Sequence, residues 1–382
     1  MTEVRSVSNF PDERCVLVAT DKFKGTLDAA TANAAIARGL RAAAPGIEVR
    51  TRRVADGGDG TLAVLLENGF EAVDVEVAGP TLVPRRSVIG RRGDEAFVEL
   101  AEICGLVQLP EGRLDGLHAS SWGLGLAIRA ALDLGARRIH VAIGGSASTD
   151  GGLGLLAALG AVATDRDGQL VTPDASGLLV VDNLDRSGLD HRLGGVAIVA
   201  VTDVRNPLTG SQGAAHVYGP QKGLDASTIV LVDAALERWA RLLRPGFSPD
   251  VPGTGAAGGV GAGILGGLGG RLTPGAPYVL DTIGFDADLA AAQLVVTGEG
   301  SWDEQSLQGK APAEVLRRAQ AAGVPAAIVA GRVASRAGLE ELGVRSITAL
   351  VELAGSAEIA MRDAEPLLER AGAELGQWLG TR

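Results

Sequence analysis

Five glycine-rich segments carry the side chains that could do chemistry in this sequence. Each segment directly follows a predicted strand and contains at least one acidic side chain. The segments are Asp21–Thr26, Ala55–Thr61, Gly144–Gly152, Thr202–Pro207 and Thr297–Asp303. Carboxylates can hold Mg²⁺ or accept a hydroxyl proton, lysines can neutralise phosphate, and backbone N–H groups can bind an anion. Together these residue types predict phosphoryl transfer.

The acidic side chains divide by the role that we expect of them. Asp203 or Asp56 is expected to orient or deprotonate the acceptor hydroxyl, and the sequence leaves the choice between the two open. Asp59, Glu299 and Asp303 are the candidates for holding Mg²⁺. For any one of these acids a turn-forming or capping role is an equal alternative, because such side chains also stabilise turns.

Lysines are scarce relative to arginines, and four of them fall inside glycine-rich motifs. We expect Lys22 to act at the reaction centre, and the others to neutralise charge on phosphate or substrate. Further candidates for binding phosphate or substrate come from the same motifs. The full set of binding candidates is Lys24, Gly57, Gly58, Gly145, Ser146, Thr149, Asp150, Asn206, Lys222 and Lys310. Ser148, Thr149 or Asp150 could instead cap the next helix, a role that is compatible with anion binding at the same turn.

Alternating strands and helices near both chain ends are expected to position these turns. Apolar runs at residues 16–20 and 294–297 indicate buried strands, and Ala-rich segments at 27–44 and 311–321 indicate helices. This βα alternation is typical of a parallel sheet. In open α/β sheets, ligands bind beyond the carboxyl ends of the strands. The five turns are therefore expected to form one site.

The middle of the chain has a different pattern, because its short apolar segments are closely spaced and separated by turn residues. That pattern indicates a mixed sheet. We therefore predict the α/β class, with a Rossmann-like or flavodoxin-like parallel-sheet domain formed by both chain ends and an inserted second α/β domain of mixed sheet. The predicted bounds are 1–80 with 282–382 for the first domain and 81–281 for the second. A length of 382 residues suits two domains.

Composition excludes several classes of protein. A net charge of −11 and a pI of 5.0 argue against a nucleic-acid-binding face, which needs basic side chains. The two cysteines form no CxxC motif, which argues against zinc or redox chemistry and fits a reducing compartment. No apolar run is long enough to span a membrane. We expect a cytoplasmic protein with no nucleic-acid or membrane partner, and a homodimer is left open.

Other catalytic and nucleotide-binding motifs do not fit. Gly253–Gly258 and Gly261–Gly266 both match GxGxxG, but neither follows a predicted strand, as dinucleotide binding requires. Gly309-Lys310 lacks the earlier glycine and the following hydroxyl residue of a Walker A loop. There is no GxSxG elbow for a serine hydrolase.

At its glycine-rich turns the sequence resembles the bacterial glycerate kinase family, and the resemblance covers nearly the whole chain. It rests on Asp21–Thr26, Ala55–Thr61, Ile143–Gly152, Asp203–Leu208, Tyr218–Gly223, Gly255–Gly263 and Thr297–Lys310. The resemblance implies ATP and Mg²⁺, glycerate as the acceptor, and a two-domain α/β fold with the active site in the cleft. It also implies a phosphoglycerate product, with 2-phosphoglycerate favoured over 3-phosphoglycerate, in organic-acid or glyoxylate-type carbon metabolism.

The sequence departs from the family pattern at three places. Lys22 stands where relatives usually have Ser, Ser120–Gly123 replaces a Thr-rich segment with Tyr-Gly, and Ser148-Thr149 precedes Asp150 where relatives often have Asn. These departures bear on substrate preference more than on the class of reaction. Two alternatives therefore stay open: a kinase for another small hydroxy acid, such as tartronate or a sugar acid, and a non-catalytic carboxylate sensor. The acid-bearing turns favour an enzyme.

Overall fold

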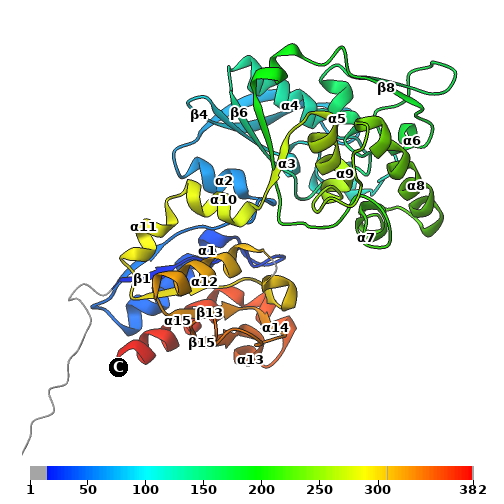
Figure 1. Ribbon diagram of the computed structural model, residues 1–382. Helices are drawn as coiled ribbons and strands as arrows, with labels where there is room; N and C mark the ends of the chain where they lie inside the picture. The colour runs from blue at the N-terminus through cyan, green and yellow to red at the C-terminus, as the bar shows by residue number, and fades with distance from the viewer. Residues whose placement is uncertain (1–14, 308, 381–382) are drawn as a thin grey trace, which may run out of the picture. The chain divides into compact units, whose positions relative to one another are not determined.

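The computed structural model describes residues 15–307 and 309–380, which form two compact units. The first unit comprises both ends of the chain, Met1–Ala55 and Val279–Arg382, and the second comprises Asp56–Tyr278. Each unit is an α/β structure built around its own sheet (Figure 1). Residues 1–14, which the sequence assigns to the first domain, lie outside the described part.

A five-stranded parallel sheet forms the centre of the first unit, in the order β15-β13-β11-β1-β2. Its strands are β1 Cys15–Val18, β2 Glu48–Thr51, β11 Leu294–Thr297, β13 Ala326–Ala330 and β15 Val344–Ala349. Val16 and Val18 point into the apolar core formed with residues 29–43 and 364–380, whereas Leu17 points to the opposite face of the sheet. All three side chains are fully buried. Burial of both faces explains why these strands are continuous apolar runs.

Helices cover this sheet on both sides. They are α1 Ala29–Ala43, α11 Phe285–Ala290, α12 Ala311–Ala322, α13 Leu350–Ala354, α14 Ala357–Arg362 and α15 Ala364–Gly380. α1 and α15 pack against each other and share one apolar core with β1, β11 and β13, while α12 also contacts β11 and β13. A short parallel pair, β12 Ser301–Trp302 and β14 Arg332–Val333, extends the chain beyond the ends of β11 and β13, and a 3₁₀ turn spans Glu304–Leu307.

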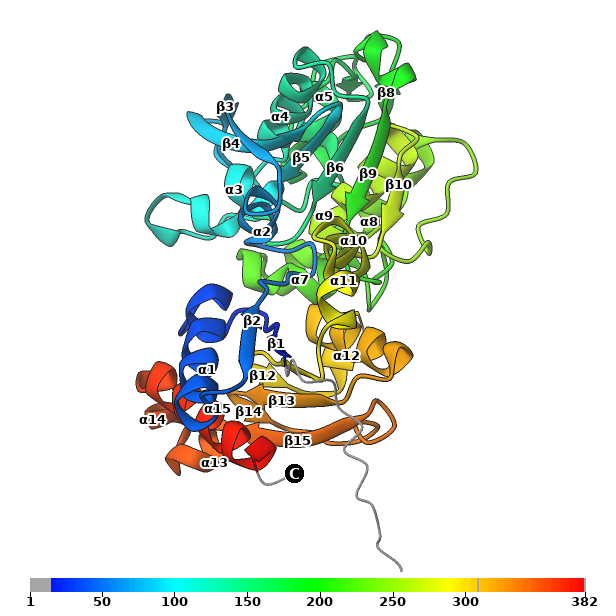
Figure 2. The same ribbon diagram turned by 90° about the vertical axis from the view of Figure 1, so that its left-hand side faces the viewer.

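The second unit has a six-stranded mixed sheet in the order β10-β9-β6-β5-β4-β3 (Figure 2). Its strands are β3 Glu71–Ala78, β4 Pro84–Arg92, β5 Glu95–Glu99, β6 Arg138–Ala142, β9 Ala197–Val201 and β10 Arg271–Thr273. The first three meet in antiparallel pairs and the remaining neighbours are parallel. β7 Val162–Thr164 and β8 Asn183–Asp185 form a separate antiparallel pair.

The helices of this unit surround two apolar clusters. They are α2 Thr61–Leu66, α3 Leu100–Cys104, α4 Trp122–Asp133, α5 Leu153–Ala158, α6 Ala175–Leu178, α7 Ala214–Tyr218, α8 Ala226–Leu243, α9 Ala256–Ala262 and α10 Gly275–Thr282. Short 3₁₀-helices span Leu106–Gln108, Pro110–Gly112, His191–Gly195 and Pro220–Lys222, and a short π-helix spans Gly263–Gly267. α10 runs through the second boundary between the units.

The first boundary differs from the one expected from the sequence. The sequence pattern predicts residues 56–80 in the first domain, but α2 and β3 belong to the second unit. The reason is strand pairing, because β3 pairs with β4 along its whole length, from Glu71↔Arg91 to Ala78↔Pro84. The second boundary lies at Tyr278/Val279, three residues before the expected one at 281/282.

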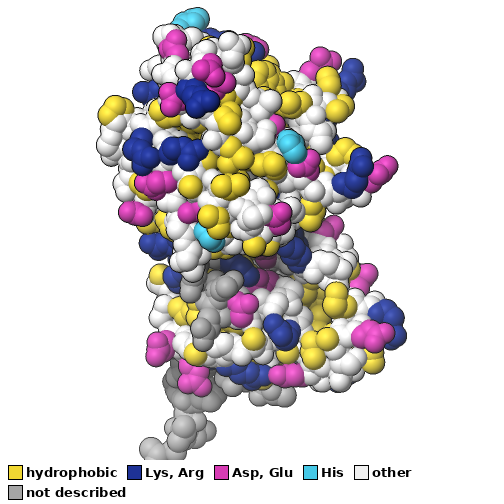
Figure 3. Space-filling model, turned by 90° about the vertical axis from the view of Figure 1, so that its right-hand side faces the viewer, with side chains coloured by type: hydrophobic (Ala, Val, Ile, Leu, Met, Phe, Trp, Pro, Cys, Tyr) yellow, Lys and Arg dark blue, Asp and Glu magenta, His cyan; other side chains and the backbone are white. Residues whose placement is uncertain are grey.

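Among the described residues, no helix combines the length and the apolar character needed to cross a membrane. Figure 3 shows acidic and basic side chains interspersed on one face of the molecule, with no single-sign patch covering it.

Glycines allow α1 and α15 to pack unusually closely. A Cβ atom on Gly39 of α1 would lie 1.8 Å from the Glu369 carbonyl oxygen, and a Cβ on Gly372 of α15 would lie 2.1 Å from the Ile36 carbonyl oxygen. We predict that Gly39→Ala lowers the free energy of unfolding by about 1–3 kcal/mol, because overpacking forces the two helices apart. Chemical denaturation measures this change.

Gly46→Ala is the matched control in the same unit, since nothing lies within 4 Å of the position that its Cβ would take. It should change the free energy of unfolding by less than about 0.5 kcal/mol. Equal effects of the two substitutions would show that the helix contact is not the cause.

Candidate active site

Two of the five turns meet at the carboxyl edge of the first unit's sheet. β1 and β11 are parallel neighbours, with Val16 opposite Leu294 and Val18 opposite Val296, so their following turns start side by side. The Asp21 N–H donates to the Gly298 carbonyl at 2.9 Å. The structure therefore brings Asp21–Thr26 and Thr297–Asp303 together.

A pocket of about 550 Å³ opens at this edge. Its charged lining consists of Lys22, Lys24, Lys310, Arg332 and Glu299. The Lys310 ammonium donates to the Glu299 Oε2 atom at 2.9 Å. All three lysines that the sequence assigns to this unit thus line one pocket.

Glu299 is the most enclosed acid of this pocket. It is 7% exposed, and no described residue donates a hydrogen bond to its buried Oε1 atom. Burial raises the pKa of Glu299 above its ordinary value. A carboxylate with one unsatisfied buried oxygen favours a cation nearby, and Glu299 therefore fits a metal-binding role.

Asp303 and Asn206 use their side chains to stabilise local backbone. The Asp303 Oδ1 atom accepts from the Ser306 N–H at 3.2 Å at the start of the 3₁₀ turn. In the second unit, Asn206 donates to the Gln212 carbonyl at 2.8 Å and accepts from the Tyr218 hydroxyl at 2.7 Å. Each residue therefore has at least a structural role.

The other three turns lie together in the second unit. Residues 56–61 lie against the carboxyl ends of β6, β9 and β10, so close that only glycine fits at two contacts. A Cβ on Gly144 would lie 2.7 Å from the Gly58 Cα, and a Cβ on Gly275 would lie 1.9 Å from the Asp56 carbonyl oxygen. Gly57 also faces Val201, the last residue of β9.

Asp203 is oriented by the start of α10. Its Oδ1 atom accepts from the Gly275 N–H at 2.8 Å, and its Oδ2 atom accepts from the Ala276 N–H at 3.3 Å. Asp56 accepts from the Gly58 N–H at 3.0 Å through its own Oδ1 atom. Because the Gly275 backbone contacts both residues, the two candidate bases lie at one edge of this sheet.

The turn after β6 is exposed at its start and buried at its end. Gly145 is exposed, whereas Ser146, Thr149 and Asp150 are all less than 5% exposed. Asp150 accepts from both the N–H and the hydroxyl of Ser121, at 2.8 and 2.7 Å, and from the Gly152 N–H at 3.1 Å. The buried residues therefore stabilise the turn from the protein interior, and Gly145 faces solvent.

Lys222 is buried beneath the same turn, contrary to its expected direct contact with a ligand. Only 2% of it is exposed, and its ammonium donates to the Ser146 hydroxyl at 2.6 Å and to the Ser148 carbonyl at 2.5 Å. Burial lowers the pKa of Lys222 to about 7. The Trp239 indole N–H adds a further support by donating to the Gly151 carbonyl at 2.9 Å.

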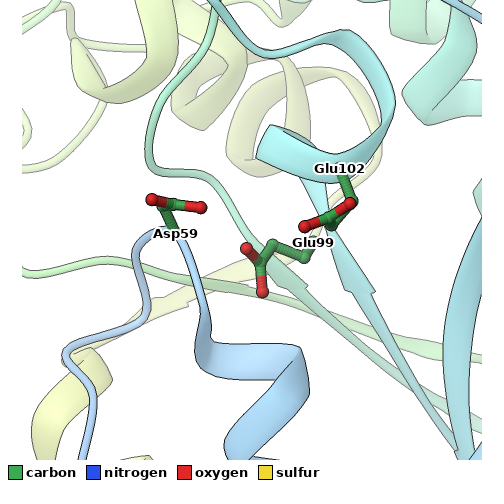
Figure 4. Close-up of side chains that lie close together, drawn as sticks. All are labelled: Asp59, Glu99 and Glu102. Atoms are coloured by element: carbon green, nitrogen blue, oxygen red, sulfur yellow. The ribbon is translucent and has the colours of Figure 1, made fainter. Parts of the chain in front are cut away.

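Asp59 lies beside two acids that the sequence analysis missed. Carboxylate oxygens of Asp59, Glu99 and Glu102 lie within 4.8 Å of one another (Figure 4). Glu99 is buried and accepts from the Gly60 and Leu62 N–H groups, both at 2.7 Å. Burial, with Asp59 and Glu102 nearby, raises the pKa of Glu99 to about 7. This acidic cluster could hold a divalent cation, which would relieve the repulsion.

A signal for Glu99 was present in the sequence. Glu99 directly follows the apolar residues 96–98 and is the last residue of β5, at the end of a strand like the residues that lead into the five turns. It escaped notice because a helix, α3, follows β5 directly with no glycine between them.

The five turns, which the sequence predicts to form one site, lie at the edges of two sheets. The first unit carries Lys22, Lys24, Glu299, Asp303 and Lys310 at its own sheet. The second unit carries the remaining candidates, at the ends of β6, β9 and β10. The turn at 55–61 follows a strand of the first unit in sequence, yet from Asp56 onward it packs with the second.

Comparison with known proteins finds glycerate kinases both by sequence and by structure. The model of the glycerate kinase family matches residues 16–380. A glycerate kinase of Bacillus subtilis strain 168 is 36% identical over 368 residues, which cover 94% of this chain and 96% of the relative. A glycerate 2-kinase of Escherichia coli K12 is 34% identical over 372 residues, covering 95% and 97%. A crystal structure assigned to glycerate kinase 2 of Salmonella typhimurium LT2 superposes with a TM-score of 0.81 at 35% identity, covering 97% and 99%.

The buried Lys222 should make stability depend on pH. Its pKa of about 7 in the folded protein lies below its ordinary value, so the unfolded chain binds more protons between these two values. The free energy of unfolding should therefore rise with pH above about 7, relative to Lys222→Met, by about 2 kcal/mol per 1.5 pH units at most. Chemical denaturation of both proteins at several pH values measures the difference.

Ser146→Ala provides the control, because it removes one hydrogen-bond partner of Lys222 and keeps the titrating amine. This variant should lose stability at every pH and retain the pH dependence. Parallel curves for the wild type and Lys222→Met would contradict the prediction.

Proposed function

The chain belongs to the glycerate kinase family, and from this premise we propose that it transfers the γ-phosphoryl group of ATP to the 2-hydroxyl of glycerate. Family membership makes it an enzyme of the glycerate kinase type. The name of the Escherichia coli relative, glycerate 2-kinase, supports 2-phosphoglycerate as the product. A role in organic-acid or glyoxylate-type carbon metabolism follows from this chemistry as part of the proposal.

The observation that carries the proposal is the meeting of Asp56 and Asp203 beside an exposed glycine turn. The two acids come from distant segments and flank the Gly275 backbone, and the exposed Gly145 turn follows the neighbouring strand β6. A carboxylate next to a glycine-rich turn suits an acceptor hydroxyl that is to attack a phosphoryl group. Either acid would orient the hydroxyl or remove its proton.

Backbone and lysine groups would neutralise the negative charge of the phosphates and the substrate carboxylate. In the second unit this role falls to the backbone at Gly57, Gly58 and Gly145, with Lys222 holding the Gly145 turn in place. In the first unit it falls to Lys22, Lys24 and Lys310. Transfer of a phosphoryl group needs such preorganised positive groups more than covalent chemistry.

Mg²⁺ fits the carboxylates of the chain. The unsatisfied Oε1 atom of Glu299, with Asp303 on the same segment, and the cluster of Asp59, Glu99 and Glu102 are the groups that would hold it. When bound, Mg²⁺ would neutralise charge on the phosphoryl oxygens. Hard oxygen ligands of this type are those that Mg²⁺ prefers.

We also place the enzyme in the cytoplasm. Cys15 and Cys104 are both free and buried, which suits a reducing compartment. A homodimer stays a proposal that light scattering would test.

Replacing either candidate base should abolish most of the activity while the fold survives. Asp203→Asn keeps an oxygen that can accept from the first turn of α10, and Asp56→Asn keeps an acceptor for the Gly58 N–H, but each loses its negative charge. We predict that turnover falls by about 10²–10⁴-fold in the variant that lacks the base. A coupled assay of ADP release measures turnover, and circular dichroism reports the fold.

Asp167→Asn, in the exposed segment after β7, is the control and should leave turnover unchanged. Near-normal turnover in both Asp203→Asn and Asp56→Asn would remove these residues from the base role. Phosphorus NMR of the product identifies the phosphorylated hydroxyl, and a 3-phosphoglycerate signal would overturn the proposed regiochemistry. A panel with tartronate and sugar acids would show whether another acceptor is preferred.

A further inference from the structure

Contacts between three rings join the helix α10 to the sheet of the second unit. Tyr278 of α10 lies over His140 of β6, with the ring centres 4.4 Å apart and the ring planes inclined by 29°. Phe97 of β5 is its other ring neighbour, with the ring centres 6.0 Å apart and the planes inclined by only 6°. These separations are typical of stacked rings. One side chain of α10 therefore packs on two central strands.

The rings lie on one face of the sheet. Phe97 and His140 are opposite each other in the parallel pair of β5 and β6, and Glu95 precedes Phe97 by one period of the strand. Because side chains alternate along a strand, all three point to the same face. Ile139 points to the other face, into the apolar core that includes α4. Tyr278 thus covers the face that this core does not reach.

A buried acid holds the His140 ring beneath Tyr278. His140 and Glu95 are 6% and 8% exposed, and the His140 Nδ1 atom lies 3.0 Å from the Glu95 Oε1 atom. Contact with His140, together with Arg92, lowers the pKa of Glu95 to about 2, so this carboxylate is ionised at neutral pH. The Tyr278 hydroxyl lies 3.4 Å from the same Oε1 atom, which is long for a hydrogen bond. We therefore assign the contact mainly to the Tyr278 ring.

The start of α10 holds one of the two candidate bases. The N–H groups of Gly275 and Ala276 donate to the two carboxylate oxygens of Asp203, at 2.8 and 3.3 Å. Directly before the helix, β10 pairs with β9 as far as Thr273. The backbone that binds Asp203 is therefore fixed on one side by a strand, and on the other side, within one helical turn, by the ring of Tyr278.

We infer that Tyr278 is a positioning residue for the phosphoryl-transfer reaction. Its ring sets the position of α10 on the sheet, and the N–H groups at the start of α10 set the direction of the Asp203 carboxylate. A shift of the helix also reaches Asp56, because a Cβ on Gly275 would lie 1.9 Å from the Asp56 carbonyl oxygen. The inference rests on the proposed function, which makes one of these acids the base. It adds a residue outside the glycine-rich turns that acts through the backbone of α10.

Removal of the ring tests the inference. In Tyr278→Ala the turnover should fall by about tenfold or more, because a small displacement of a catalytic group lowers the rate steeply. The KM values for ATP and glycerate should stay within about twofold of the wild-type values, since no candidate binding group is changed. Tyr278→Phe keeps the ring and should retain turnover within about twofold. Val230→Ala, at a position of α8 that is 59% exposed, is the control and should leave turnover unchanged.

A double-mutant cycle separates positioning from a loss of folded protein. Tyr278→Ala is combined with Asp203→Asn and, separately, with Asp56→Asn, and a coupled assay of ADP release measures turnover in each protein. In the background that lacks the base, the position of α10 no longer affects proton transfer, so the loss caused by Tyr278→Ala should shrink to less than about twofold. A merely structural effect would lower the amount of active enzyme by the same factor in every background.

The outcomes distinguish this inference from the proposed function. Equal losses in the wild-type background and in both Asn backgrounds would overturn the positioning role and leave the proposed function standing. Normal turnover of Tyr278→Ala would do the same, because β10 alone would then fix the start of the helix. Near-normal turnover of both Asp203→Asn and Asp56→Asn would instead overturn the base role in the proposed function, and the positioning role with it.

Discussion

Close approach of main chain to main chain, at the carboxyl ends of parallel strands, is the constraint on which the candidate site depends. In the second unit Gly144 and Gly275 contact the segment from Asp56 to Asp59 at distances that no side chain would allow. In the first unit the contact is made through hydrogen bonds, from the Asp21 N–H to the Gly298 carbonyl and from the Gly331 N–H to the Glu299 carbonyl. Turns packed in this way hold their acids and lysines near one another, although these residues are far apart in sequence.

Burial of charged side chains is the second organising feature. Most of these side chains form hydrogen bonds with backbone groups and hydroxyls. Asp150, Lys222 and Glu99 each have at least two hydrogen bonds to such partners. An ionised group in the interior is strongly destabilising unless it is paired in this way. Glu299 differs because it retains a buried oxygen without a described donor. Glu299 therefore has coordination capacity left for a ligand.

The α/β class, the positions of most strands along the chain and most of the turns were predictable from the sequence. Buried parallel strands are continuous apolar runs, and many of them end at polar, glycine-rich turns. The unit to which β3 belongs was not predictable. The sequence of a strand indicates which of its faces is buried but not which strand it pairs with, and β3 pairs with β4, the next strand along the chain. The burial of Lys222 and Asp150 was equally hidden, because a Lys or Asp in a glycine-rich motif looks the same whether it faces a ligand or supports the turn. Glu99 was missed because its signal is a single residue at the end of a strand without glycine.

Asp203 is a candidate base and is also bound to the start of the helix α10. Asp203 accepts from the first two N–H groups of this helix, and Tyr278 within it stacks on His140 with ring centres 4.4 Å apart. The following residue, Val279, already belongs to the other unit. The carboxylate that is expected to meet the acceptor hydroxyl therefore also caps the helix through which the chain leaves the second unit.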